Sequence, residues 1–263
     1  MNLRFSRKHL SIPYTVFLLC FVIAPLFVVL YYAFTNGEGR FTVENFVNFF
    51  QSPNTIGTLC YSFAVAVTVT LCCTLIAYPV AYILAKSNLK KKTVLLVLFI
   101  APMWINFTLR VVALKEVLTM IEGNLAYHPF FNTVVGMTYD FLPFMILPLY
   151  TALSKMGQSY LEAAADLGAD SAVTFFKVTL PLSLPGLISG VTMVFLPSMT
   201  NYVILDMLYN STYIMGSLIG SYFNAYDWHS GSLISIVLLA IIFILTWTTN
   251  GFQEEETDRG AIL

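Results

Sequence analysis

Charged residues are scarce in this sequence. Lys, Arg, Asp and Glu together make up 10% of the 263 residues, and 58% are hydrophobic, whereas a soluble domain typically carries about 25% charged residues. A soluble fold needs a polar surface, because charged side chains are almost never buried without a partner. The shortage therefore predicts an integral membrane protein. The formal net charge of −1 argues against a nucleic-acid-binding protein, which would carry a basic patch.

Metal-binding and nucleotide-binding patterns are also missing. The four cysteines form no C-x-x-C pair, so neither a disulfide framework nor a zinc site is expected. The three histidines are far apart and form no cluster with metal-ligand spacing. No G-x-x-x-x-G-K-[ST] phosphate loop occurs, so the chain cannot bind ATP through that motif. We therefore expect no cofactor in this chain.

Long apolar runs, in contrast, are abundant. A membrane-spanning helix needs about 20 mostly apolar residues, and six runs meet this requirement: 13–34, 58–84, 93–120, 133–153, 185–205 and 232–250. They are continuously apolar, without the alternation of a membrane β-barrel, which predicts an all-α membrane protein with six spans. The first run is too long for the apolar part of a signal peptide and has no cleavage site after it, so it is predicted to stay as the first span.

The basic residues predict the orientation in the membrane. Cytoplasmic segments carry an excess of Lys and Arg, and both termini are therefore expected in the cytoplasm. Of the other basic residues, Arg40 falls in an outer loop, and Arg110 and Lys115 fall in or near the third span. The inner segments then contain ten of the thirteen basic residues: Arg4, Arg7, Lys8, Lys86, Lys90, Lys91, Lys92, Lys155, Lys177 and Arg259.

The segment between the fourth and fifth runs is amphipathic and lies on the predicted inner side. Residues 162–167 are helix formers, and Gly168 can end that helix. A second short helix can run over residues 171–177. Pro181 and Pro185 are expected to break the chain before the fifth span.

Small and acidic residues distinguish the first of these helices. Ala163, Ala164 and Leu167 are expected on one face, where small side chains let another surface approach closely. Glu162 and Asp166 are four residues apart and carry the same charge, which costs a few tenths of a kcal/mol in isolation. A partner with basic groups would explain this pair. An ordinary amphipathic loop at the membrane interface explains the residue types equally well.

A spaced motif points to a known family. The chain carries Glu162-Ala163-Ala164, then Gly168, then Val178-Thr179-Leu180-Pro181. This resembles the pattern E-A-A-x3-G-x9-I-x-L-P of the membrane subunits of binding-protein-dependent ABC importers, with valine in place of isoleucine. The resemblance implies a type I ABC importer permease fold with a cytoplasmic coupling helix that docks in a groove of a separate ATPase. The implied docking residues are Glu162, Ala163, Ala164, Asp166, Leu167 and Gly168.

The resemblance extends over most of the chain. Residues 78–82, 101–106, 109–110, 142–150 and 196–199 look like the permeases of spermidine/putrescine importers. This implies an ATP-driven polyamine importer in the bacterial inner or plasma membrane, in which the chain forms half of the pathway and is not itself an enzyme. The implied partners are a second homologous permease, two copies of a cytoplasmic ATPase that bind ATP and Mg, and an extracytoplasmic polyamine-binding protein.

Three parts are expected along the chain. Residues 1–56 would form a cytoplasmic segment, the first span and an outer loop. Residues 57–250 would form the transport core, including the coupling loop 154–184, and residues 251–263 a cytoplasmic tail. The apolar residues of the loop are expected to pack it onto the ends of the spans rather than touch the ATPase: Phe175, Phe176 and Val178.

A polyamine pathway needs carboxylates and aromatic faces, because polyamines are flexible polycations and each cation–π contact contributes about 0.5–2 kcal/mol. Ionisable groups within spans are candidates by default. Trp104 fits an interfacial belt equally well, and Asp206 fits a cap of the outer loop. For Asp140, pairing with Arg110 is favoured over contact with substrate. The pathway candidates are Trp104, Asn106, Asp140, Tyr202 and Asp206.

Two other functions stay open. The same kind of permease could import an anion, iron or a sugar, and Arg110 is the residue that could serve an anion. A secondary transporter or a membrane enzyme is less favoured. The halves show no convincing repeat, and the spans contain no nucleophile–base or metal set.

Overall fold

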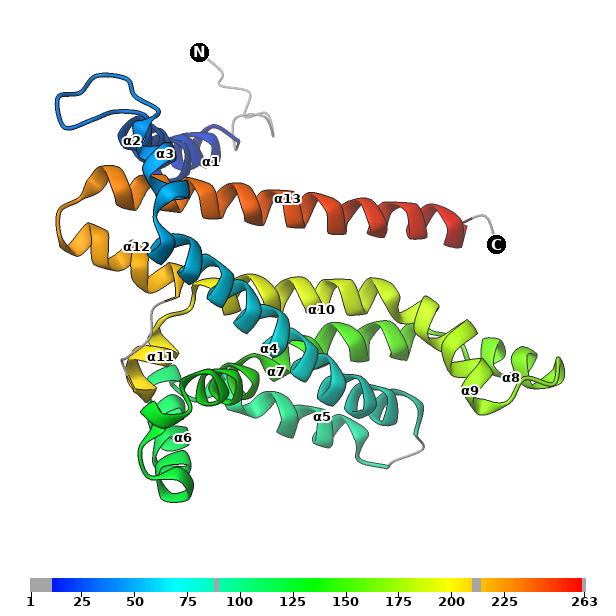
Figure 1. The fold of residues 1–263 in the computed structure, drawn as a ribbon. Helices are drawn as coiled ribbons and strands as arrows, with labels where there is room; N and C mark the ends of the chain where they lie inside the picture. Colours follow the sequence, from blue (N-terminus) through cyan, green and yellow to red (C-terminus); the bar gives the residue numbers. More distant parts are fainter. Residues whose placement is uncertain (1–10, 88–89, 210–213, 262–263) are drawn as a thin grey trace, which may run out of the picture. The chain divides into compact units, whose positions relative to one another are not determined.

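The computed structural model describes residues 11–87, 90–209 and 214–261, and their side chains from 13 to 247. Over these residues the backbone is helical (Figure 1), and its β-type pairing is limited to a bridge between Thr35 and Phe41. Some residues used for the predicted orientation lie outside the described part of the chain: Arg4, Arg7 and Lys8, together with the side chains of the tail 251–263.

The helical elements follow one another with short connections. In chain order they are α1 (Ser11–Leu18), η2 (Leu19–Ile23), α2 (Ala24–Ala33), α3 (Glu44–Gln51), α4 (Pro53–Lys86), α5 (Lys92–Ile100), η3 (Ala101–Trp104), α6 (Phe107–Glu122), η4 (Leu125–Tyr127), α7 (Pro129–Lys155), α8 (Gln158–Asp166), α9 (Ser171–Thr174), η5 (Phe175–Thr179), α10 (Leu180–Thr200), α11 (Val203–Leu208), α12 (Met215–Asn224) and α13 (Trp228–Ala261).

The predicted number of spans is confirmed when a bent helix pair is counted as one span. That pair, Lys92–Trp104 and Phe107–Glu122, meets at 98°, at the place where Pro102 and its polar neighbours interrupt the third apolar run. Five further helices of the described chain are long and apolar enough to cross a membrane: Pro13–Ala33, Pro53–Lys86, Pro129–Lys155, Ser171–Thr200 and Trp228–Trp247.

The chain forms two compact units, residues 1–57 with 217–241 and residues 58–216 with 242–263. In the first unit, polar contacts gather at the end of α2. The Asn45 side chain of α3 donates to the carbonyls of Ala33 and Thr35 at 3.1 and 3.0 Å.

In the same unit, His229 Nδ1 of α13 lies 2.9 Å from the Tyr32 carbonyl, which can only accept, and the two rings pack edge to face. These contacts fasten α3 and the start of α13 to α2.

The core of the second unit surrounds α7. Among the five straight candidate spans, α7 has the largest buried share, 61% against 33% or less for the others. Its inward side chains recur at helical spacing, as expected of a helix face that packs in a core; they include Met137, Phe141, Met145, Leu149 and Leu153. The face of α4 in the same cluster repeats every fourth residue: Val65, Val69, Cys73, Ala77 and Ala81.

Two glycines bring α10 close to α7. A Cβ on Gly186 would lie 2.5 Å from the Ala152 Cβ and 2.8 Å from the Pro148 carbonyl oxygen. A Cβ on Gly190 would lie 2.6 Å from the Met145 sulfur. The glycines are four residues apart and share one face, the spacing by which membrane helices approach closely. This contact gives α10 its fixed position on α7.

The prediction that Pro181 and Pro185 break the chain before the fifth span is wrong. The helix runs from Ser171 to Thr200, with Pro181 in the first turn of α10 and Pro185 in its interior. Pro181 nevertheless lies inside this continuous helix, just after the π-helical turn η5, so its missing N–H removes a backbone bond there. Pro185, which is exposed, also removes a backbone bond, and membrane helices tolerate such a loss when nearby groups or local adjustments of the helix satisfy the freed backbone group.

The fifth span also ends earlier than predicted. It stops at Thr200, and residues 203–208 form the separate helix α11. The side-chain oxygen of Asn201 accepts the backbone N–H of Val203 at 3.2 Å, a local bond that competes with helix continuation. α11 packs against α6 and α7, where a Cβ on Gly136 would lie 2.9 Å from Leu208 Cδ1.

Candidate docking loop and pathway residues

The predicted docking helix is present as α8 and ends at the predicted glycine. Gly168 has φ +79°, a conformation that glycine adopts without steric cost. Its N–H donates to the Ala165 carbonyl at 2.9 Å, and the Ala169 N–H donates to the Ala164 carbonyl at 3.0 Å. This pair of bonds is the Schellman pattern that closes a helix C-terminus. The helix begins at Gln158, four residues before the predicted start.

Most of the predicted docking residues are accessible, but Ala164 is not. Glu162, Ala163, Asp166, Leu167 and Gly168 are exposed, Leu167 by 89%, whereas Ala164 is 7% exposed. The prediction that Ala163, Ala164 and Leu167 share one accessible face is therefore wrong for Ala164. Residues four apart on a helix share a face, whereas adjacent residues do not, and α8 packs against α9 and η5.

The two acidic residues of α8 have no ionic partner in the described part of the chain. Glu162 and Asp166 are exposed, and neither takes part in a hydrogen bond or ion pair among the described side chains. Two like charges on one short helix are mildly repulsive. The face of α8 that carries them is therefore suited to a surface with basic groups.

The aromatic pair of the loop divides between packing and exposure. The Phe175 ring packs edge to face on Tyr78 and Tyr82 of α4, with ring centroids 5.4 and 6.2 Å apart, which confirms its predicted packing role. Phe176 is 65% exposed, so the same prediction is wrong for it. Successive side chains point in different directions around the π-turn η5, and only one of the two can face α4.

Arg110 and Asp140 pair with each other, as favoured from the sequence. The two side chains form an ion pair between α6 and α7 and are 8% and 3% exposed. Arg110 Nη1 also donates to the Pro102 carbonyl at 2.7 Å. Asp140 is thus held by Arg110 inside the core. Arg110 joins both halves of the bent pair to α7.

Trp104 and Asn106 lie at the bend itself. Trp104 ends η3 and is 77% exposed. Asn106 caps α6, and its side-chain oxygen accepts the backbone N–H groups of Thr108 and Leu109 at 3.0 and 3.4 Å. A side-chain cap of this kind satisfies donors that a helix start leaves unpaired. Asn106, which is predicted to line the pathway, therefore also stabilises the start of α6.

Tyr202 and Asp206 lie at the end of α10 and on α11, outside the straight candidate spans. Tyr202 is 38% exposed, and Asp206 is exposed and has no ion pair among the described residues. Partial desolvation by its surroundings raises the pKa of the Asp206 carboxyl. α11 packs against α6, but no hydrogen bond or ring contact of the described residues joins Asp206 to Trp104.

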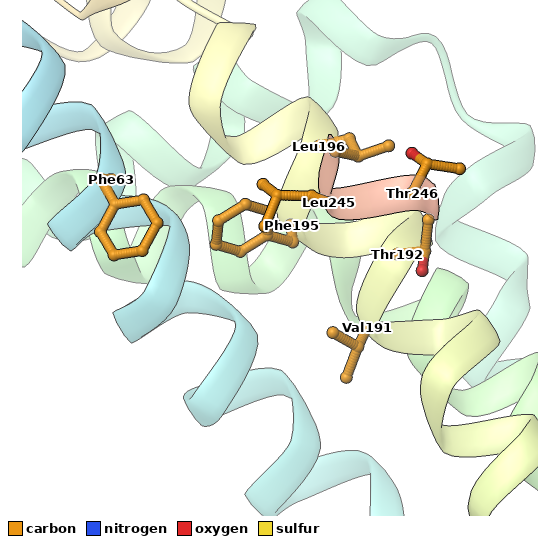
Figure 2. A pocket seen from close by; sticks show the side chains of 7 residues that line it. All are labelled: Phe63, Val191, Thr192, Phe195, Leu196, Leu245 and Thr246. Atoms are coloured by element: carbon orange, nitrogen blue, oxygen red, sulfur yellow. The ribbon is translucent and has the colours of Figure 1, made fainter. Parts of the chain in front are cut away.

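An apolar cavity of about 220 Å³ lies elsewhere in the same unit (Figure 2). Phe63 of α4, Val191 and Phe195 of α10, and Leu245 of α13 are among its lining residues. The Thr192 hydroxyl in its wall donates to the Ile188 carbonyl at 2.9 Å. Among the described side chains, none that line the cavity is charged and none is a predicted site residue. It therefore lacks the chemistry that binds a polycation.

Some contacts of the loop could not be predicted from residue types. Lys86 Nζ donates to the Met156 carbonyl at 2.7 Å, and the hydroxyls of Tyr78 and Ser183 lie 2.7 Å apart. Lys86 reads in the sequence only as one basic residue of an inner segment. By contrast, the spacing of Gly186 and Gly190 is visible in the sequence and is a recognised signal of close helix packing.

An all-helical membrane protein whose fourth and fifth spans are joined by an exposed, glycine-terminated helix has the architecture of an ABC importer permease subunit. A bacterial alginate ABC transporter, in complex with its alginate pentasaccharide-bound periplasmic protein, contains a chain with TM-score 0.74 at 13% identity, over 94% of this chain and 93% of that chain. The MetNI methionine ABC transporter, in an inward-facing conformation, gives TM-score 0.59 at 16% identity, over 78% and 99%. The predicted permease fold is confirmed.

The chain belongs to the family of binding-protein-dependent transport system inner membrane components, which residues 77–254 match. The spermidine/putrescine transport system permease protein PotB of Haemophilus influenzae is 33% identical to it, over 95% of this chain and 96% of the relative. PotB of Escherichia coli strain K12 is 30% identical, over 83% and 86%. The chain is thus a multi-pass membrane component of a transport system that works with a binding protein.

Proposed function

We propose that the chain is a permease subunit of an ATP-driven importer of polyamines such as spermidine and putrescine. The observation that carries this proposal is the 33% identity to a spermidine/putrescine permease over 95% of the chain. The chain forms half of the translocation pathway and leaves ATP hydrolysis to a partner. Its complex comprises a second homologous permease, two copies of a cytoplasmic ATPase that bind ATP and Mg, and an extracytoplasmic polyamine-binding protein.

The charges in the core favour a cation over an anion. An anion would need a free basic group, but the buried Arg110 is already paired with Asp140. A passing cation therefore meets no unpaired positive charge there. Asp206 is exposed and without an ionic partner, and the exposed rings of Trp104 and Tyr202 offer faces for cation–π contact. These three residues are the proposed pathway groups, and Asn106 and Asp140 hold the surrounding helices in place.

The exposed face of α8 docks on the ATPase in this proposal. Leu167 supplies an apolar contact, and Glu162 and Asp166 supply negative charge toward basic groups of the partner. Ala163 and Gly168 leave room for close approach, whereas Ala164 packs α8 onto its own loop. α8 lies in the cytoplasm with both termini, and closure of the ATPases on ATP moves it.

Uptake by the reconstituted complex tests the pathway. Proteoliposomes that contain the wild-type chain, its partner permease, the ATPase and the binding protein should take up labelled spermidine when ATP is supplied. Asp206→Asn and Trp104→Ala should each lower uptake several-fold, because a carboxylate and a cation–π contact of about 0.5–2 kcal/mol are removed.

Matched controls separate this effect from general damage. Glu116→Gln removes another exposed carboxylate, and Trp247→Ala removes another exposed tryptophan, 72% exposed against 77% for Trp104. Both controls should keep full uptake, and all four variants should assemble with the ATPase. Full uptake by Asp206→Asn and Trp104→Ala would reject the pathway assignment, and uptake of an anion or a sugar in place of spermidine would reject the substrate.

A further inference from the structure

Three side chains on one face of α4 point to the docking loop. Tyr78, Tyr82 and Lys86 are spaced by four residues, so that they lie in one row along the helix. The row contacts the loop at its beginning, near its end and in between. We call Tyr78, Lys86 and the Phe175 ring that packs on the row the α4 fastening.

Lys86 holds the beginning of the loop. It is the last residue of α4, and its ammonium donates to the carbonyl of Met156, which directly follows α7, at 2.7 Å. The last carbonyls of a helix have no partner within the helix, and a cation is favourable there because the helix dipole is negative at that end. Lys86 therefore joins the ends of two spans at the point where the loop begins.

Tyr78 holds the other end of the loop. Its hydroxyl lies 2.7 Å from that of Ser183 near the start of α10, and the two residues are 8% and 1% exposed. Ser183 already donates to the Leu180 carbonyl at 3.0 Å, so the Tyr78 hydroxyl is the donor to Ser183. A buried hydrogen bond of this kind leaves an unpaired polar group when one partner is removed.

Between these two anchors, the segment packs through η5, where Thr179 is fully buried. α8 is largely exposed and packs against α9 and η5. From η5, Phe175 extends onto Tyr78 and Tyr82. The loop is joined covalently to α7 and α10, so a displacement of α8 moves these two helices. Through η5 and the two polar anchors, the displacement also reaches α4.

We propose that Lys86 and Tyr78 are positioning residues that make α4 move together with the docking loop. The inference rests on the proposed docking of the ATPase at α8. Without the α4 fastening, the ATPase still docks, but its closure moves α4 less, and hydrolysis is no longer matched to transport.

The test uses the complete complex in nanodiscs and in proteoliposomes. Lys86→Met and Tyr78→Phe each remove one donor while keeping the bulk of the side chain. Each should reduce stimulation of ATP hydrolysis by spermidine-loaded binding protein, and spermidine moved per ATP, about two- to tenfold, the range that one net hydrogen bond provides. Basal hydrolysis and the amount of bound ATPase should stay as in the wild type. Lys86→Arg, which keeps a cationic donor, should restore most of the coupling.

Control variants make the result specific. Lys90→Met removes an exposed lysine of the same inner segment. Tyr150→Phe removes a half-buried hydroxyl of α7 that has no hydrogen-bond partner among the described residues. Both should keep wild-type coupling. Wild-type coupling in the Lys86→Met/Tyr78→Phe double variant, or equal losses in the controls, would overturn the proposal. Unchanged binding of the ATPase to a Leu167→Asp variant, which places a charge on the exposed end of α8, would instead reject docking at α8.

Discussion

Arg110 shows how one residue can decide the local shape of a membrane protein. Its guanidinium joins the Pro102 carbonyl on one side of the bend to Asp140 on α7. A buried ion pair is weak evidence for stability, since desolvation offsets much of the attraction between the charges. Removal of only one of the two charged side chains nevertheless destabilises the fold strongly, because the remaining charge is left buried without a partner.

The free energy of unfolding in detergent should report this asymmetry. Arg110→Met leaves Asp140 unpaired in the core and should lower the free energy of unfolding by about 3–5 kcal/mol. The double variant Arg110→Met/Asp140→Leu removes both charges and should recover most of the loss. If the double variant were as unstable as the single one, the contact with Pro102 would be the important interaction, and the ion pair would not.

The sequence predicted which residues belong to the docking loop, but not which of their side chains are exposed and which are packed. Gly168 could be assigned from the sequence because a helix end that needs positive φ favours glycine. Ala164 and Phe176 could not, because their exposure depends on which face of α8 and η5 meets the rest of the loop. That choice is made by packing partners far away in the sequence, such as Tyr78 and Tyr82.

At the scale of elements, the contact between α7 and α10 is the firmest in the second unit. Gly186 and Gly190 let the backbone of α10 lie against α7, where even one methyl group has no room. Overpacking such a contact typically costs about 1–3 kcal/mol.

Gly186→Ala should therefore lower the melting temperature of the purified chain. The added Cβ would lie 2.5 Å from that of Ala152 and 2.8 Å from a backbone oxygen, and neither can move freely. Gly57→Ala is the matched control in α4, where an added Cβ meets no atom within 4 Å. It should be neutral or slightly stabilising, because alanine favours the helix by about 1 kcal/mol over glycine. Equal melting temperatures for the two variants would contradict the packing assigned to Gly186.

The apolar runs predicted the spans, but they did not predict where and how the helices within them break or end. The third run contains Pro102 and polar residues, which mark a break. The angle of 98° at that break is not encoded in the run, and Arg110 bridges the break through its bond to the Pro102 carbonyl. Pro185 suggested an end, but the helix continues through it to Thr200. The apolar run that ends at Leu205 hides the boundary between α10 and α11, because α11 is as apolar on its packed side as a span.

At the scale of the whole molecule, the distribution of charge predicts which ends of the spans face the cytoplasm. Cytoplasmic segments are enriched in Lys and Arg, and the loop around α8 falls on the enriched side with Lys155 and Lys177. The same rule predicts that the loop before α3 lies on the opposite side.

Labelling of single cysteines in intact cells checks this orientation. In a background without Cys20, Cys60, Cys72 and Cys73, Gly37→Cys and Ser171→Cys place thiols in two exposed loops. A membrane-impermeant maleimide should label position 37 in intact cells, but position 171 only after permeabilisation, because opposite membrane faces are expected for the two loops. The reverse pattern would contradict the predicted orientation and the cytoplasmic docking of α8.

The bend between η3 and α6 also sets a limit on how the chain fits the thickness of a bilayer. The segment Lys92–Trp104 has thirteen residues and, at about 1.5 Å per residue in α5 and about 2 Å in the 3₁₀ helix η3, reaches about 22 Å. The hydrocarbon layer measures about 30 Å, so this half of the pair falls short of the far side by about a quarter of the distance. We therefore expect thinner lipid or a neighbouring protein beside Trp104. Hydrophobic mismatch at the break between η3 and α6 thus favours either the binding of a partner helix or local thinning of the membrane.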